Sequence, residues 1–234
     1  MATVSPADAQ RLRQAQDGVR ALIERDLRAL VASLDTTRPE AALAAVREYV
    51  PVLVAQYGGS AAAVAADWYD EVRADARIPG RFRAAMDVPD RSTEADATVR
   101  RLAGAIFDGD PSAMLPGLLS AIPRLALTGA RQTITTSSAR DPQASGWQRV
   151  TRSGACGFCR MLAGRGGVYR EATVHFASHG SCNCAAVPSW DPHAPEVDVT
   201  VYRASQRTST MTPEQRERHR ALVRSAVERY APEE

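Results

Sequence analysis

The chain contains no lysine, and all 29 of its basic residues are arginine. Schiff-base chemistry, which needs a lysine amine, is therefore excluded, and the positive charges are guanidinium groups suited to bidentate pairing with carboxylates or phosphates. The 27 acidic residues nearly balance them, which leaves a formal net charge of +2. A net charge so close to zero does not indicate a broad nucleic-acid-binding surface.

Long apolar runs are also missing. No apolar stretch approaches the roughly twenty residues of a membrane span, and the N-terminal segment lacks the apolar core of a secretory signal peptide. We therefore expect a soluble protein, made in the cytoplasm and without a membrane partner. Aromatic residues make up only 6% of the 234 residues, whereas alanine and leucine dominate the first half, which favours a core of helices packed on helices.

Common catalytic signatures are absent as well. The sequence has no P-loop, no G-x-G-x-x-G, no G-x-S-x-G and no H-E-x-x-H. A zinc deaminase would need H-x-E ahead of P-C-x-x-C, and neither occurs. A cysteine nucleophile with a histidine base could still be assembled from Cys182 or Cys184 with His175 or His179. The sequence otherwise predicts a protein that is not an enzyme.

Cysteine is confined to one segment of the chain. Cys156 and Cys159 form a C-x2-C pair, and Cys182 and Cys184 form a C-x-C pair that His179 precedes as H-x-x-C-x-C. Four thiols and an imidazole from two short loops suit a tetrahedral structural zinc ion, with a turn between the first two sulfurs. We therefore expect zinc as the cofactor, held by four of these five residues.

The favoured ligands are Cys156, Cys159 and His179, together with either Cys182 or Cys184. Three alternatives use the same thiols. An oxidising compartment would produce disulfides instead, and the cysteines could also be packed without a ligand. A thioredoxin-type C-x2-C would need to lie at a helix start after a strand, and no βαβ pattern surrounds it.

This segment resembles the MuF-like minor capsid family, the phage head morphogenesis proteins of tailed bacteriophages, especially the actinobacteriophage branch. The shared pattern is C-x-x-C beside a Leu-Ala-x-Arg-Gly turn, followed by Val168-Tyr169, His-x-x-Cys-x-Cys and Pro188. The resemblance covers 147–190, about a fifth of the chain. Many relatives have proline after the histidine, whereas His179 is followed by Gly180, which makes the local turn softer.

The resemblance implies a non-catalytic structural protein of the phage head. Such proteins associate with the portal or the capsid interior and aid head assembly or DNA delivery. The implied partners are the portal protein, the major capsid protein and possibly packaged DNA, and the implied location is the virion, with an oligomer or several copies in each particle. Two other functions stay open: a capsid-maturation protease or toxin-like effector enzyme, and a zinc-knuckle nucleic-acid-binding protein.

The pattern of apolar residues predicts a mostly α protein in four parts. We expect an α-helical domain at residues 1–135, a linker at 136–146, a small α+β module with the Cys/His knuckle at 147–200, and a basic C-terminal helix or tail at 201–234. The helical segment up to about Ala130 is expected to fold alone, because its capping signals and apolar stripes are self-contained.

Capping residues mark the expected helix starts. A second helix begins with a capping box at Thr37, contains Pro51 and ends before Gly58-Gly59, and a third begins at Ser60. Further helices are expected from Ser5, from Ser92 or Thr93, from Asp110-Pro111 and from a capping box at Thr212. Short strands are expected at 147–152, 168–169, 174–176 and 197–202.

Overall fold

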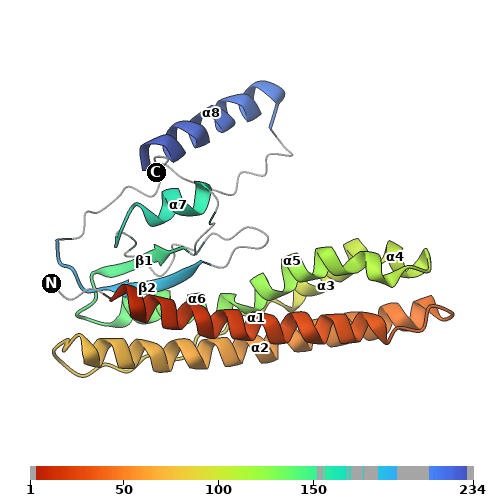
Figure 1. The fold of residues 1–234 in the computed structure, drawn as a ribbon, viewed down its shortest axis with the longest axis horizontal. Helices are drawn as coiled ribbons and strands as arrows, with labels where there is room; N and C mark the ends of the chain where they lie inside the picture. The colour runs from red at the N-terminus through yellow and green to blue at the C-terminus, as the bar shows by residue number, and fades with distance from the viewer. Residues whose placement is uncertain are drawn as a thin grey trace.

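Two long helices, α1 (Pro6–Ala32) and α2 (Pro39–Asp75), form the base of the molecule. They run antiparallel along its longest axis in the computed structural model (Figure 1). The structure describes residues 4–151, 155, 157–167, 169, 176, 184–193 and 211–230. Its fold is mostly α-helical with a small two-stranded sheet, as the sequence predicts.

Helix α1 begins where the sequence places it. The Ser5 hydroxyl accepts a hydrogen bond from the Asp8 amide at 3.1 Å, and Pro6 occupies the first helical position. Proline has no amide hydrogen to lose there, and Asp8 lies in the first turn, where the helix dipole favours a carboxylate. The buried face of α1 carries Leu12, Ile23, Leu27 and Val31.

Helix α2 replaces the two helices predicted between residues 37 and 78. It passes through Gly58-Gly59 without a break, and Pro51 lies inside it. The predicted capping box is wrong: Arg38 is the residue before the helix, with no side-chain cap, and Thr37 bonds to Asp35 instead. Gly58 is buried against α6 (Thr128–Arg140), so this glycine permits a close helix crossing rather than ending a helix.

Shorter helices cover one half of the long pair. They are α3 (Ser92–Leu102), α4 (Gly104–Phe107), the 3-10 turn η1 (Pro111–Met114) and α5 (Leu115–Ala126). The predicted starts at Ser92 and at Asp110-Pro111 are confirmed. These elements enclose an apolar cluster with α1 and α2, made of Ile23, Leu27, Val31, Val46, Val50, Leu53, Val99, Ile106, Met114, Leu118 and Ile122, among others. We call this the α5 cluster.

Helix α6 is the main departure from the prediction. Its polar sequence indicated a helix tail and then a linker from residue 136, yet the helix continues to Arg140 and buries Thr133, Thr135 and Thr136. The hydroxyls make this possible, because Thr133 accepts from the Asp87 amide at 3.0 Å and Thr136 donates to the Asp87 carboxylate at 2.6 Å. Small side chains with satisfied hydroxyls can be buried at a tight helix contact.

The sheet pairs β1 (Gly146–Val150) with β2 (Ala185–Ser189) in antiparallel register. Strand β1 and a bridge between Trp147 and Tyr169 agree with the predicted strands at 147–152 and 168–169. Strand β2, which contains Pro188, was not among the predicted strands. The amide and carbonyl of Trp147 both bond to Tyr169 on the other side, so the opposite residue, Pro188, needs no amide hydrogen. Except for Phe176, the strands predicted at 174–176 and 197–202 lie outside the described residues.

Two more helices complete the described chain. Helix α7 (Gly157–Ala163) follows β1, and α8 (Pro213–Tyr230) contacts α7 on the side away from the long helices (Figure 1). The capping box at the start of α8 is confirmed: the Gln215 amide donates to the Thr212 hydroxyl at 3.3 Å, and the Thr212 amide donates to the Gln215 side chain at 2.8 Å.

A second apolar cluster joins the helices to the sheet. It contains Ala9, Leu12, Ala65, Trp68, Tyr69, Ile134, Trp147, Tyr169, Ala186, Val187 and Trp190, among others, and we call it the sheet cluster. Residues from the predicted helical domain and from the predicted module therefore share one core. The division into separately folding domains stays a prediction.

Two helical stretches, Pro39–Asp75 and Pro111–Arg140, are long and apolar enough to cross a membrane by length and composition alone. Of their most apolar windows, 44% and 56% are buried inside the protein. The same stretches supply much of both apolar clusters.

Candidate metal centre

Cys159 and Cys184, one from each half of the cysteine motif, lie together in a small buried cluster. Each is 2% exposed, and Ala155, Phe158 and Phe176 pack around them. Cys159 belongs to α7, whereas Cys184 directly precedes β2. The antiparallel sheet and the helix that follows β1 thus bring together two thiols that are far apart in the sequence.

The other candidate ligands, Cys156, His179 and Cys182, lie outside the described residues. Their described neighbours, however, belong to the same cluster: Ala155 directly precedes Cys156, and Phe176 lies three residues before His179. Within the described residues there is no group of three His, Cys, Asp or Glu side chains that could hold a metal. Only two of the five candidates are described, so the zinc knuckle stays a prediction.

The first cysteine pair differs from the open turn that was expected. Gly157 is the first residue of α7 and Cys159 the third, so a helix rather than a loop carries the second thiol of C-x2-C. A strand followed by a helix start is also what a thioredoxin-type pair requires. Here, however, β1 pairs antiparallel with β2, which is not the parallel arrangement of a βαβ unit.

A stack of rings fixes Phe176 beside this cluster. Tyr169 stacks on Trp147 with ring centroids 4.3 Å apart, and Trp147 stacks on Phe176 at 5.7 Å. Burial raises the pKa of the Tyr169 hydroxyl. The stack holds Phe176 against β1, beside the two cysteines.

Two buried arginines adjoin the same cluster. Arg131 of α6 is 1% exposed and donates to the Cys184 carbonyl at 3.1 Å, and Arg149 of β1 is 3% exposed. Their guanidinium carbons lie 5.1 and 3.7 Å from the centroid of the Phe176 ring. Sequence reasoning missed both, because nothing distinguishes a buried arginine from an exposed one in a chain that has 29 basic residues, all arginine.

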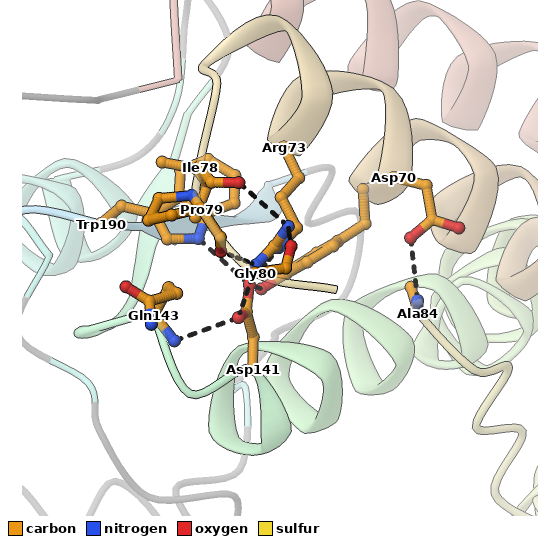
Figure 2. Close-up of polar contacts among 10 residues, drawn as sticks. Asp70, Arg73, Ile78, Pro79, Gly80, Ala84, Asp141, Gln143 and Trp190 are labelled. Carbon is orange, nitrogen blue, oxygen red and sulfur yellow. Dashed lines mark hydrogen bonds and ion pairs between the residues drawn. The ribbon is translucent and has the colours of Figure 1, made fainter. Parts of the chain in front are cut away.

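A second buried group of polar side chains connects the module to the helices (Figure 2). The Asp141 carboxylate, just after α6, accepts from Arg73 of α2 at 2.9 Å and from the Trp190 indole at 3.2 Å. Tyr69 donates to the same carboxylate at 3.2 Å, and the Gln143 amide donates to it at 3.1 Å. The Asp141 side chain is completely buried.

The charges in this group depend on one another. Burial by itself raises the pKa of Asp141, but hydrogen bonds from Arg73, Gln143 and Trp190 outweigh it and hold the pKa below its ordinary value. Burial, followed by the nearby Asp141 charge, raises the pKa of Tyr69 well above its usual range.

Arg73 also fixes the loop that follows α2. Its guanidinium donates to the Pro79 carbonyl at 2.8 Å and to the Gly80 carbonyl at 3.0 Å (Figure 2). Through Trp190, which directly follows β2, the same group holds the end of the sheet against α2 and α6. At the other end of β1, Arg13 of α1 donates to the Thr151 carbonyl.

A family model described as VG15 protein matches residues 3–209 of the chain. The match covers most of the sequence, including the whole cysteine motif, and the chain therefore belongs to the VG15 family, a family of bacteriophage proteins. No curated protein and no solved structure matches it. Membership of this family agrees with the phage origin implied by the resemblance. The family match does not by itself assign the minor capsid role.

Proposed function

We propose that the protein is a structural, MuF-like minor capsid protein of a tailed bacteriophage. In this role it is present in several copies at the portal or in the capsid interior, where it contacts the portal protein or the major capsid protein and aids head assembly or DNA delivery. Membership of a phage family and the motif at residues 147–190 support the proposal.

The proposal includes one structural zinc ion in the cysteine module, held by four of Cys156, Cys159, His179, Cys182 and Cys184. The observation that carries it is the burial of Cys159 with Cys184, beside the neighbours of Cys156 and His179. Such a centre would order a module with little apolar core of its own, because a structural zinc contributes on the order of 10–16 kcal/mol. This matches the whole stability of a typical domain.

The proposed role is architectural rather than catalytic. A cysteine nucleophile has to be ionised, positioned by a base and open to its substrate. Cys159 and Cys184 are each 2% exposed, and a thiolate that binds zinc does not attack a carbonyl. At the cysteines that bind metal, the structural and protease roles therefore exclude each other.

Substitution of Cys159 by Ser in the phage tests this proposal. We expect fewer folded and incorporated copies and malformed or poorly infectious heads, while processing of the capsid protein continues unchanged. Met161→Leu is the matched control: Met161 is buried in the same helix, and an apolar change that conserves volume costs little.

Two results would contradict the proposal. One is a Cys159→Ser protein that is incorporated normally but no longer supports cleavage of a head protein, which would identify an enzyme. The other concerns location: density for the protein next to the portal in intact particles is expected, and recovery only from the host cytosol would exclude a virion role.

A further inference from the structure

The outer face of α2 is a stripe of uncharged residues with one charge at each end. Residues three and four positions apart lie on the same side of a helix. On this side they are exposed or half-buried: Arg38, Ala41, Ala45, Tyr49, Val52, Gln56, Ser60, Ala63 and Asp67. In Figure 1, α2 forms the lower edge of the molecule. The stripe is therefore open to solvent along its whole length.

The middle of the stripe is apolar although it is exposed. Between Glu48 and Asp67, α2 has no charged residue, yet only 44% of the most apolar window of the helix is buried. Val52 is 60% exposed, more than any other large apolar side chain that the structure describes, and Tyr49 and Val64 are exposed as well. Exposed apolar side chains that gather on one face mark an interaction surface.

The two charges at the ends of the stripe are of opposite sign and equally far from Val52. Arg38 is 14 residues before Val52 and Asp67 is 15 residues after it, so each lies about 22 Å from the middle. Both are exposed, and within the described part of the chain neither side chain belongs to an ion pair. A second copy of the helix, antiparallel and centred on Val52, brings Arg38 of each copy beside Asp67 of the other.

The same antiparallel register sets uncharged residues opposite one another along the rest of the stripe. The opposing pairs are Ala41 with Ala63, Ala45 with Ser60, and Tyr49 with Gln56. Small side chains at these positions allow the two helices to pack closely, and a crossing angle of about 20° keeps both ends within reach of a long arginine side chain. Asp67 would also lie near the positive N-terminal end of its partner's α2, which favours a carboxylate.

We propose that the outer face of α2 is a two-fold interface between two copies of this chain, centred on Val52 and held at both ends by an ion pair between Arg38 and Asp67. The inference depends on neither the zinc centre nor the capsid role. From Ala41 to Ala63 the face is about 33 Å long. With a width of about 20 Å, that of two packed helices, it approaches the ~800 Å² per partner of a standard stable interface.

The first test changes the centre of the face in the reduced, full-length protein. Interfaces of this size bind at micromolar concentration or below, so sedimentation equilibrium should show a wild-type dimer. Val52→Glu and Val52→Arg each bring like charges together and should weaken dimerisation at least about 10-fold, whereas an equimolar mixture of the two variants should form heterodimers. Leu222→Glu, at a similarly exposed position of α8, is the control and should dimerise like the wild type.

The second test exchanges the two charges. Arg38→Asp or Asp67→Arg alone should weaken the dimer about 10-fold, because each places like charges together at both ends. The double variant Arg38→Asp/Asp67→Arg should restore it. Both exchanges suit the helix itself, since Asp favours its start and Arg its end, so neither should unfold the monomer. Within one chain the two positions are about 44 Å apart, and only a second copy can therefore explain a rescue.

Several results would overturn the inference. They are a wild type that stays monomeric at tens of micromolar, in the range where interfaces of this size associate, an oligomer that Val52→Glu leaves intact, and a double charge exchange that rescues nothing. A monomeric wild type that binds phosphatidylcholine vesicles, and loses this binding in Val52→Glu, would assign the face to a membrane surface instead.

Discussion

Single buried charges connect parts of this chain that the sequence keeps far apart. Arg73 and Asp141 are 68 positions apart, yet their side chains form an ion pair with hardly any exposure to solvent. The pair is also hydrogen-bonded to Tyr69, Trp190 and backbone carbonyls. Breaking such a pair is costly, because the remaining charge stays buried without compensation.

Asp141→Asn removes this charge at nearly constant shape. We expect the free energy of unfolding to fall by about 3–5 kcal/mol, because Arg73 is left buried opposite a neutral amide. Asp96→Asn is the control: Asp96 pairs at the surface with Arg47 and Arg100, both about half-exposed, and loss of its charge should cost at most about 1 kcal/mol. Chemical denaturation measures both, and similar losses for the two variants would contradict the account.

The same carboxylate gives the protein a pH dependence with a definite sign. The pKa of Asp141 is lower in the folded protein than in the unfolded chain. Its contribution is therefore fully present above the unfolded value of about 3.9, and it is lost as the pH falls through the lower folded value. Below about pH 4 the wild type should lose stability more steeply than Asp141→Asn. Parallel curves would show that Asp141 is not the group responsible.

At the scale of elements, α2 and α6 cross with their backbones in close contact. A Cβ atom added at Gly129 would lie 2.4 Å from the Gly58 carbonyl oxygen, and this atom belongs to the backbone and cannot rotate away. At Gly59, by contrast, an added Cβ would meet nothing within 4 Å. Neighbouring glycines in one helix therefore differ: Gly58 lies at the crossing, and Gly59 does not.

This difference makes a paired prediction. Gly129→Ala should lower the free energy of unfolding by about 1–3 kcal/mol, because the two helices have to separate. Gly59→Ala should raise it by up to about 1 kcal/mol, because alanine is the better helix former and has room. Thermal or chemical denaturation gives both values. If both variants were more stable than the wild type, or both less stable, the backbones of α2 and α6 would not approach each other this closely at Gly129.

Local signals predicted the elements that begin with a capping residue. Ser5 and Thr212 each cap a helix start that the structure confirms, α3 begins at the predicted Ser92 but has no side-chain cap, and the alternation after Gly146 marks β1. These predictions succeeded because the deciding interactions lie within a few residues of each other.

The errors arose where tertiary contacts override local preference. Gly58-Gly59 indicated a helix end, but α6 packs against Gly58. Residues 136–140 indicated a linker, but Asp87 satisfies Thr136 and allows it to be buried. Strand β2 was not predicted, and Pro188 lies in it at a position where no amide hydrogen is needed. In each example the deciding partner is distant in sequence.

The candidate site could likewise be predicted only in part. Spacing alone indicated that the two cysteine pairs meet, and the structure brings Cys159 and Cys184 together. The guanidinium groups of Arg131 and Arg149 and the Asp141 group could not be predicted, because they reach the module from other elements. No local pattern identifies which of the 29 arginines are buried.

At the scale of the whole molecule, the two apolar clusters have different compositions. The buried residues of the α5 cluster all lie within residues 23–126, whereas the sheet cluster needs Trp147, Tyr169 and Trp190 from the cysteine module. The module is thus part of the core of the helical region. In a fragment of residues 1–130, we therefore expect the half of α2 that packs in the α5 cluster to fold, and the half that packs in the sheet cluster to lose much of its support.

A fragment of residues 1–130 tests this view. Hydrogen exchange should show protected amides at 42–54 of α2, which pack in the α5 cluster, and fast exchange at 61–72, which lose the sheet, Trp190 and most of α6. The full-length chain, protected in both regions, is the control. Equal protection of both regions in the fragment would show instead that the helical region is an independent domain.

The central claim is that the cysteine module is held together by a metal ion, and the most direct measurement is the metal content of the reduced, full-length protein. The account predicts one zinc per chain, with X-ray absorption showing sulfur neighbours at about 2.3 Å. Protein without stoichiometric metal would contradict it, and two disulfides found by thiol titration would identify oxidation as what holds the module together.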